Sequence, residues 1–153
     1  MILLCYGTRP EWIKIKPLIK AFEDKVPYRL LFTGQHADIS GGWYHDKLKI
    51  TEGTNRLDSI FSSVMNNINF DGVNDVLVQG DTATCLAVGL SAFNHKVPVI
   101  HLEAGLRTYD LNHPYPEEGY RQMLSRITDV HLCPTNNAKT HLLRDSVGGE
   151  IHV

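Results

Sequence analysis

Short apolar runs alternate along this sequence with longer segments whose apolar residues recur at helical spacing. Uninterrupted apolar runs between glycine, proline or charged residues predict strands buried on both faces, since a strand with one wet face would alternate apolar and polar side chains. Such runs lie at 2–6, 28–33, 75–79, 97–104, 129–133 and 151–153. Helices are predicted after the first run to about Asp24, at about 55–67, 82–95 and 117–127, and up to about Arg144, with a loop at 34–54.

Regular alternation of strand and helix predicts the fold class. It is typical of α/β domains, in which a Rossmann-like parallel sheet is covered by helices on both faces and joined by right-handed crossovers. A length of 153 residues suits one domain with a sizeable core. The last apolar run, at 151–153, is expected to be an edge strand or the point at which a second domain would begin.

Composition excludes several classes of function. Fifteen Lys and Arg against 17 Asp and Glu give a net charge of −2, so no basic surface predicts a nucleic-acid partner. No apolar run approaches the roughly 20 residues that span a bilayer, and the N-terminus lacks the pattern of a signal peptide. Cys5, Cys85 and Cys133 are an odd number without CxxC spacing, which favours buried reduced thiols. We therefore expect a cytoplasmic protein with neither a membrane nor a nucleic-acid partner.

Polar residues gather where three of the predicted strands end. In an open parallel sheet, ligands bind beyond the carboxyl ends of the strands. The segments GTRPEWIK (7–14), GDT (80–82) and HLEAGLRTYDLNHPYPEEGYRQ (101–122) follow the strands at 2–6, 75–79 and 97–104. We expect these three segments to converge on one cleft.

The first segment suits an anion. Gly7 permits a tight turn, and the free N–H groups at the start of the following helix favour a negative charge. Arg9 can bind a phosphate through two nitrogens, and Lys14 adds a positive charge one turn later. On this stretch alone, a helix start with solvated Arg and Lys side chains is an equally good interpretation.

Three acidic residues are candidates for catalysis. Asp81 directly follows Gly80 at the end of a predicted strand, although an N-cap of the next helix is an alternative role for it. Glu103 should share one face of its strand with His101, and a carboxylate at the end of a buried strand needs partners. Glu117 begins a helix, where an acidic side chain also stabilises the helix dipole.

A metal site and a serine hydrolase are both disfavoured. The pattern His101-x-Glu103 is similar to the HxE of zinc deaminases, but Cys133 is followed by Pro134 and Thr135 where a PCxxC partner would be required. No GxSxG elbow is present for a Ser-His-Asp hydrolase. No metal is expected.

Five motifs in order give a more specific indication. GTRPEWIK, TGQH (33–36), GDT, HLEAGLRT (101–108) and PYPEE (114–118) together resemble the N-terminal domain of the non-hydrolysing UDP-N-acetylglucosamine 2-epimerases. The resemblance covers residues 1–153 and implies the N-terminal half of a glycosyltransferase-B (GT-B) fold, with the C-terminal UDP-binding domain absent from this chain. It implies a cytoplasmic isomerase of cell-surface polysaccharide biosynthesis that interconverts UDP-GlcNAc and UDP-ManNAc, as a homodimer or with a separate C-terminal half, without NAD or metal.

The resemblance also assigns residues. It places Arg9, Lys14, Asp81 and Glu103 at substrate-binding positions and Asp81, Glu103 and Glu117 at catalytic ones. Inversion at C2 without an oxidant can proceed by elimination of UDP across C1–C2 and its re-addition, which requires a base and an acid on opposite faces of the sugar. Glu103 or Asp81 would handle the C2 proton, with Glu117 on or near the other face.

Other readings stay open. A hydrolysing epimerase that releases ManNAc and UDP would share these motifs. A non-catalytic sugar-nucleotide-binding or assembly module is a second alternative, although three carboxylates at the rim speak against it. A glycosyltransferase that is not an epimerase is a third, disfavoured by the motif order. Three interpretations of the chain itself are also open: a single domain of a longer protein, a natural truncation or one half of a split enzyme.

Overall fold

A parallel sheet forms the centre of the molecule. The computed structural model describes residues 1–37, 39 and 42–153. Within these residues, seven strands pair in the order β3-β2-β1-β4-β5-β6-β7, all parallel. The strands are β1 (Ile2–Tyr6), β2 (Tyr28–Phe32), β3 (Asp46–Lys47), β4 (Asp75–Gln79), β5 (Val99–Leu102), β6 (Val130–Leu132) and β7 (Glu150–His152). The predicted α/β fold with a parallel sheet is confirmed.

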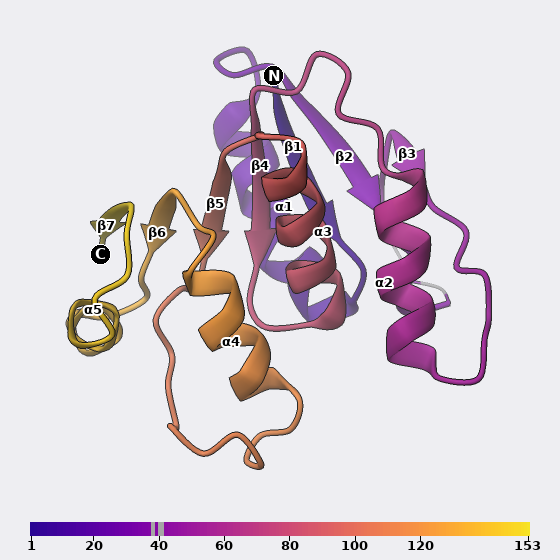
Figure 1. Cartoon of the computed structure of the whole chain (residues 1–153). Helices are drawn as coiled ribbons and strands as arrows, with labels where there is room; N and C mark the ends of the chain where they lie inside the picture. The colour runs from indigo at the N-terminus through magenta and orange to yellow at the C-terminus, as the bar shows by residue number, and fades with distance from the viewer. Residues whose placement is uncertain (38, 40–41) are drawn as a thin grey trace.

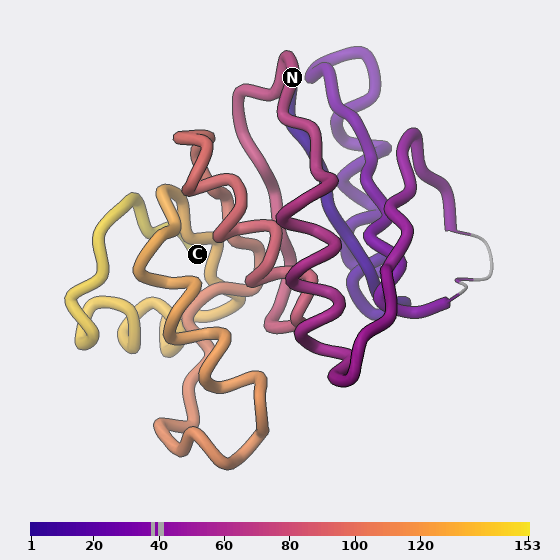
Figure 2. Tube along the Cα trace, turned by 45° about the vertical axis from the view of Figure 1, so that its right-hand side comes forward, coloured from indigo at the N-terminus to yellow at the C-terminus, as the bar shows by residue number. Residues whose placement is uncertain are grey.

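Helices connect the strands at nearly the predicted positions. They are α1 (Arg9–Phe22), α2 (Arg56–Asn67), α3 (Ala83–Asn94), α4 (Glu117–Ser125) and α5 (Asn136–Arg144). The last predicted strand is β7, and it lies at an edge of the sheet as one of the two expectations had it. In both views the segment between β5 and α4 extends beyond the body of the domain (Figures 1 and 2).

One strand lies within the segment that was expected to be a loop, 34–54, of which residues 38, 40 and 41 are outside the described residues. β3 pairs Asp46 with Leu31 and Lys47 with Phe32. Both β3 residues are exposed, and the strand is held by backbone hydrogen bonds at the edge of the sheet. An apolar pattern cannot reveal such a strand, because charged residues are well suited to an exposed edge.

Both faces of the sheet are covered, as predicted. Alternate residues of β1 point to opposite sides, so Leu3 and Cys5 join one core while Leu4 and Tyr6 join the other. The first core includes side chains from α2, α3 and α4, and the second contains Trp12 and Ile15 of α1. Figure 1 shows α1 on the opposite side of the sheet from α3. The sheet is thereby a rigid base whose strand ends have fixed relative positions.

Small residues allow the helices on the first face to approach closely. A Cβ atom added to Gly89 of α3 would lie 2.5 Å from Leu124 Cδ1 of α4.

The three cysteines are buried and free, which confirms the interpretation of Cys5, Cys85 and Cys133 as buried thiols. Within the part of the chain that the structure describes, no helix combines the length and the apolar character needed to cross a membrane.

Two histidines lie side by side inside the sheet. His101 of β5 and His131 of β6 are register partners, and they are 2% and 0% exposed. Nε2–H of His101 donates to the carbonyl oxygen of Gly80 at 2.7 Å, and His131 makes the same kind of bond to Gly148 at 3.0 Å. Burial lowers the pKa of His101 from 6.5 to about 4 and also lowers the pKa of His131. Both rings are therefore neutral near pH 7.

This pair makes stability depend on pH. Because the folded-state pKa of His101 is below the unfolded value, the unfolded chain binds a proton first as the pH falls. The stabilisation is complete above pH 6.5 and is lost between pH 6.5 and about 4, at a cost of about 3 kcal/mol for His101. We expect His101→Gln, which keeps a donor for Gly80, to lose less stability over this interval in urea unfolding. The exposed His113→Gln is the control, and equal pH slopes for His101→Gln and wild type would contradict the prediction.

Candidate active site

A cavity of about 280 Å³ lies beyond the carboxyl ends of β1, β4 and β5. It is lined by Thr8, Pro10, Glu11, Lys14, Gln35, His36, Gln79, Gly80, Asp81, Thr82 and Glu103. Parts of all three predicted segments meet there, together with two residues of the TGQH motif. The prediction that the three segments converge at the strand ends is confirmed, since residues of each line one cavity.

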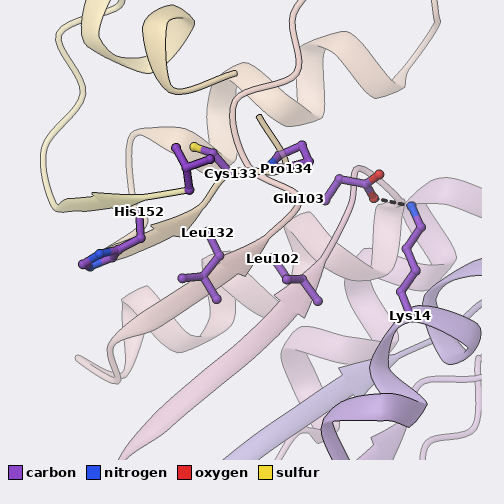
Figure 3. Close-up of a pocket in the computed structure, with 8 residues that line it drawn as sticks. Lys14, Leu102, Glu103, Leu132, Cys133, Pro134 and His152 are labelled. Carbon is purple, nitrogen blue, oxygen red and sulfur yellow. Dashed lines mark hydrogen bonds and ion pairs between the residues drawn. The ribbon is translucent and has the colours of Figure 1, made fainter. Parts of the chain in front are cut away.

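A second cavity of about 390 Å³ adjoins the first and shares Lys14 and Glu103 with it. Figure 3 shows Lys14 and Glu103 at one end and Leu102, Leu132, Cys133, Pro134 and His152 along the remaining wall. The lining of this second cavity is mostly apolar. The Lys14–Glu103 ion pair therefore stands between a polar compartment and an apolar one.

The β1–α1 turn is built around Glu11. Its Oε2 accepts hydrogen bonds from the backbone N–H of Gly7 at 2.8 Å, from the N–H of Thr8 at 2.7 Å and from the Thr8 hydroxyl at 2.8 Å. Thr8 is in turn the N-cap of α1, so the two residues form a capping box. The expectation of free N–H groups for an anion is therefore wrong at Gly7 and Thr8, whose N–H groups are taken by this carboxylate.

Glu11 also reaches the next turn of the sheet. The hydroxyl of Thr82, in the β4–α3 turn, donates to Glu11 Oε1. The side chain is 1% exposed, and burial raises the pKa of its carboxyl, while the bonds from Thr82, Gly7 and Thr8 lower it without cancelling the rise. Sequence reasoning missed this residue, although the spacing Thr8-x-x-Glu11 is the signal of a capping box.

Gly7 has a packing role in the same turn. A Cβ atom at this position would lie 2.1 Å from Thr84 Oγ1 and 2.3 Å from Thr33 Oγ1. Those two hydroxyls are themselves hydrogen bonded at 2.8 Å. The glycine thus lets the turn after β1 pack closely against the start of α3.

Asp81 does not cap α3. Thr82 is the N-cap, and its hydroxyl accepts from the N–H of Cys85 at 3.1 Å. Asp81 instead pairs with Arg121 of α4: its Oδ2 accepts a hydrogen bond from Nε at 2.9 Å, and Nη2 lies 2.6 Å from the same oxygen in the ion pair. The capping alternative is wrong because the threonine one residue later takes that position. Arg121 was not singled out from the sequence, since nothing in a local motif indicates a partner 40 residues away.

Arg121 is itself held by a buried carboxylate. Glu118 is 0% exposed and accepts from Arg121 Nη1 at 3.3 Å, from the N–H groups of Thr108 and Tyr109, and from Gln122. These hydrogen bonds outweigh burial and lower the pKa of Glu118. Glu118 therefore fixes α4 to the preceding loop and keeps the guanidinium of Arg121 directed at Asp81.

Glu103 leaves the strand in an unusual conformation. β5 ends at Leu102, and Glu103 has φ of 70°, in the left-handed region that costs a non-glycine residue about 1–2 kcal/mol. Its Oε2 accepts from both Lys14 Nζ and Gln79 Nε2 (Figure 3 shows the Lys14 contact). The expectation that His101 and Glu103 share a strand face is wrong, because the backbone turns after Leu102 and His101 stays buried below.

Two predicted site residues lie outside both cavities. Arg9 is exposed at the start of α1, with its backbone N–H 3.4 Å from His36 Nδ1. Glu117 begins α4, and its Oε2 is shielded from solvent without a hydrogen-bond partner among the described residues. Neither side chain is among the described residues that line the two cavities. Their roles stay predictions. The described residues include no group of three His, Cys, Asp or Glu side chains arranged for a metal.

Comparison with known proteins identifies relatives. Residues 20–153 match the family model described as UDP-N-acetylglucosamine 2-epimerase. The UDP-N-acetylglucosamine 2-epimerase of Salmonella borreze is 36% identical over an alignment of 159 positions, which covers 95% of this chain and 42% of that protein. The chain thus spans less than half the length of this curated relative.

Solved structures agree with the sequence comparison. The UDP-GlcNAc 2-epimerase from Neisseria meningitidis bound to UDP-GlcNAc superposes with a TM-score of 0.92 and 32% identity, over 99% of this chain and 45% of that one. The enzyme from Methanocaldococcus jannaschii in complex with UDP-GlcNAc and UDP gives a TM-score of 0.85 and 32% identity, with the same coverage of 99% and 45%. The fold is that of the N-terminal part of these GT-B-like proteins.

The Glu11 contacts predict a contrast between two substitutions. Glu11→Gln keeps an oxygen for Gly7 and Thr8 and supplies an N–H toward Thr82, whereas Glu11→Met leaves buried donors without an acceptor. We expect the glutamine variant to stay within about 1 kcal/mol of wild type and the methionine variant to lose about 3 kcal/mol in urea unfolding. Equal losses for the two variants would show that packing, and not the hydrogen bonds, accounts for the role of Glu11.

Proposed function

The chain belongs to the UDP-N-acetylglucosamine 2-epimerase family, and on that premise we propose that it carries acid–base residues for interconversion of UDP-GlcNAc and UDP-ManNAc. The observation on which this rests most is the meeting of Lys14, Asp81 and Glu103 at one cleft of the sheet. A cation beside two carboxylates suits a substrate that has both a diphosphate leaving group and a neighbouring C–H group to be deprotonated as it leaves. Named relatives act on, or are bound to, the same sugar nucleotide.

The proposed chemistry is elimination followed by re-addition. A carboxylate removes the proton from C2 of the sugar while the bond from C1 to the diphosphate oxygen breaks, which gives a glycal and UDP. UDP then re-forms its bond to C1 as a proton is delivered to the opposite face of C2. The sequence is redox neutral, so its electron balance requires no oxidant or reductant.

Roles for the residues follow from their positions. We assign the C2 proton to Glu103, with Asp81 as the second carboxylate of the cleft, because Glu103 lies where the two cavities meet. Lys14, with its Nζ beside Glu103, is placed to contact the departing diphosphate. The proposal keeps Arg9 as a second phosphate contact and Glu117 as the group nearer the other sugar face, and the family resemblance supports both.

The rest of the active assembly is also proposed. Since the chain matches only about 42% of the length of its curated relatives, we expect a second, UDP-binding half to complete the cleft. A cytoplasmic homodimer, or a complex with a separate C-terminal half, follows from the same family resemblance. The hydrolysing alternative receives no support from the names of the relatives, which are those of epimerases.

Isotope exchange at C2 tests the proposed function. With UDP-GlcNAc in heavy water, we expect proton NMR to show loss of the C2 proton signal, because the proton returned to C2 comes from solvent. Glu103→Gln should slow that loss at least about a hundredfold, as expected for removal of a general base. The control is Glu23→Gln, an exposed glutamate at the end of α1.

Several outcomes of this experiment would contradict the assignment. A Glu103→Gln variant that exchanges as fast as wild type would exclude Glu103 as the base. Free ManNAc and UDP among the products would indicate the hydrolysing reaction. Substrate resonances that broaden without any exchange would indicate a half-site that binds the sugar nucleotide and does not turn it over alone.

The role of Lys14 can be tested by binding alone. Lys14→Met retains the aliphatic stem and removes the charge, so we expect UDP to bind about tenfold more weakly and with less dependence on salt. Lys16→Met is the matched control, because Lys16 is an exposed lysine on the same helix outside both cavities. Isothermal titration at two salt concentrations measures both effects. Equal affinities for the Lys14→Met and Lys16→Met variants would remove Lys14 from the binding site.

A further inference from the structure

Glu103 has two partners that differ in character. Lys14 has a long side chain that is 46% exposed, and in the proposed function its ammonium group contacts the diphosphate. Gln79 is the last residue of β4, is 2% exposed and donates through Nε2 to the same carboxylate oxygen. Only the amide nitrogen can face a carboxylate oxygen favourably, so the orientation of the Gln79 amide is determined by this contact.

Both partners converge on one oxygen. Lys14 Nζ and Gln79 Nε2 contact Glu103 Oε2, and among the described residues no hydrogen bond is made to Oε1. In Figure 3 the second carboxylate oxygen points away from Lys14. The two oxygens are therefore not equivalent, since one is anchored and the other is available to a substrate.

The hydrogen bond from Gln79 to Glu103 joins residues at the ends of two neighbouring strands. Gln79 is the register partner of Leu102, the residue before Glu103, and the N–H of Gly80 donates to Leu102 O at 3.0 Å directly beyond that pair. The donor is thus the last residue of β4, and the acceptor is the residue directly after β5, next to a backbone hydrogen bond that joins the two strands. Side chains held in this way by strands are positioned more narrowly than side chains on loops.

The backbone conformation of Glu103 makes the hydrogen bond from Gln79 important for the position of the carboxylate. A left-handed φ of 70° is unfavourable for glutamate, and it turns the side chain away from the strand toward β4 and α1. A conformation of this kind persists only where its surroundings determine it. The hydrogen bond from Gln79 is a contact that can hold the carboxylate when Lys14 is engaged elsewhere.

We propose that Gln79 is a positioning residue, whose amide holds Oε2 of Glu103 so that Oε1 is the oxygen presented to the C2 proton. The inference rests on the proposed function and adds to it a named oxygen and a named support. Because the amide is neutral, it orients Glu103 without supplying a second positive charge. Other ionisable groups around the two cavities are Glu11, Asp81, His36, His152 and Cys133.

A substitution of equal length isolates the amide. Gln79→Met keeps the volume of the side chain and removes the donor, so Glu103 should lose its fixed orientation while the cavity keeps its shape. We expect the C2 exchange rate at saturating UDP-GlcNAc to fall about tenfold, with the affinity for UDP-GlcNAc within about twofold of wild type. The matched control is Asn66→Leu, which removes an exposed side-chain amide on α2 that donates to Ser62 O at 2.8 Å and lies outside both cavities.

Coupling separates positioning from a general loss of structure. In a Glu103→Gln background, Gln79→Met should have no further effect on exchange, because the group it positions is already inactive. A further tenfold loss in that background would overturn the proposal. So would an unchanged exchange rate in Gln79→Met, or a fall explained entirely by weaker binding.

A spectroscopic measurement can detect the Gln79–Glu103 hydrogen bond without any catalytic turnover. In the ¹⁵N spectrum of the wild-type chain saturated with UDP, we expect one Gln79 side-chain amide proton to be shifted downfield and to move upfield in Glu103→Gln. If the chain binds UDP-GlcNAc without exchange, the proposed function of the isolated chain fails, and this spectrum alone decides the role of Gln79. An amide signal that Glu103→Gln does not change would overturn the positioning role.

Discussion

The buried carboxylate of Glu11 is the interaction on which the cleft depends. It connects the turn after β1 to the turn after β4 through Gly7, Thr8 and Thr82. The same contacts determine where α1 begins, since Thr8 is its N-cap, and where α3 begins, since Thr82 is its N-cap. Lys14 lies three residues after Glu11 on α1. Its position relative to Glu103 therefore depends on the hydrogen bonds of Glu11, which involve neither Lys14 nor Glu103.

The order of the strands explains why the cleft lies at this place. β1 leads to β2 on one side of the sheet, whereas β4 leads to β5 on the other. Adjacent connections that diverge in this way leave a crevice at the carboxyl ends of the two central strands. The polar cavity lies there, and β5 contributes Glu103 from the neighbouring position. Topology thus determines the place of the site, and the motifs determine its chemistry.

The sequence was sufficient for features that are local or repeated. Buried apolar runs predicted the strands, and polar residues after three of them predicted the cleft. It could not reveal β3, whose charged residues belong to an exposed edge, or the partner of Asp81, which lies 40 residues away. It also placed Glu103 on the wrong face, because a left-handed residue depends on its tertiary contacts. Glu11 was within reach of the sequence, since its capping box is a local pattern.

The two rim carboxylates differ in how firmly their charges are matched. Oδ2 of Asp81 is contacted by two nitrogens of Arg121, whose side chain is 15% exposed and is also held by the buried carboxylate of Glu118. Glu103 is paired with Lys14, a half-exposed side chain that can turn to another anion. A diphosphate entering the cleft therefore competes easily for Lys14 and poorly for Arg121. In the proposed reaction this frees the charge of Glu103 when substrate is bound and leaves Asp81 neutralised, which is the physical reason to assign the C2 proton to Glu103.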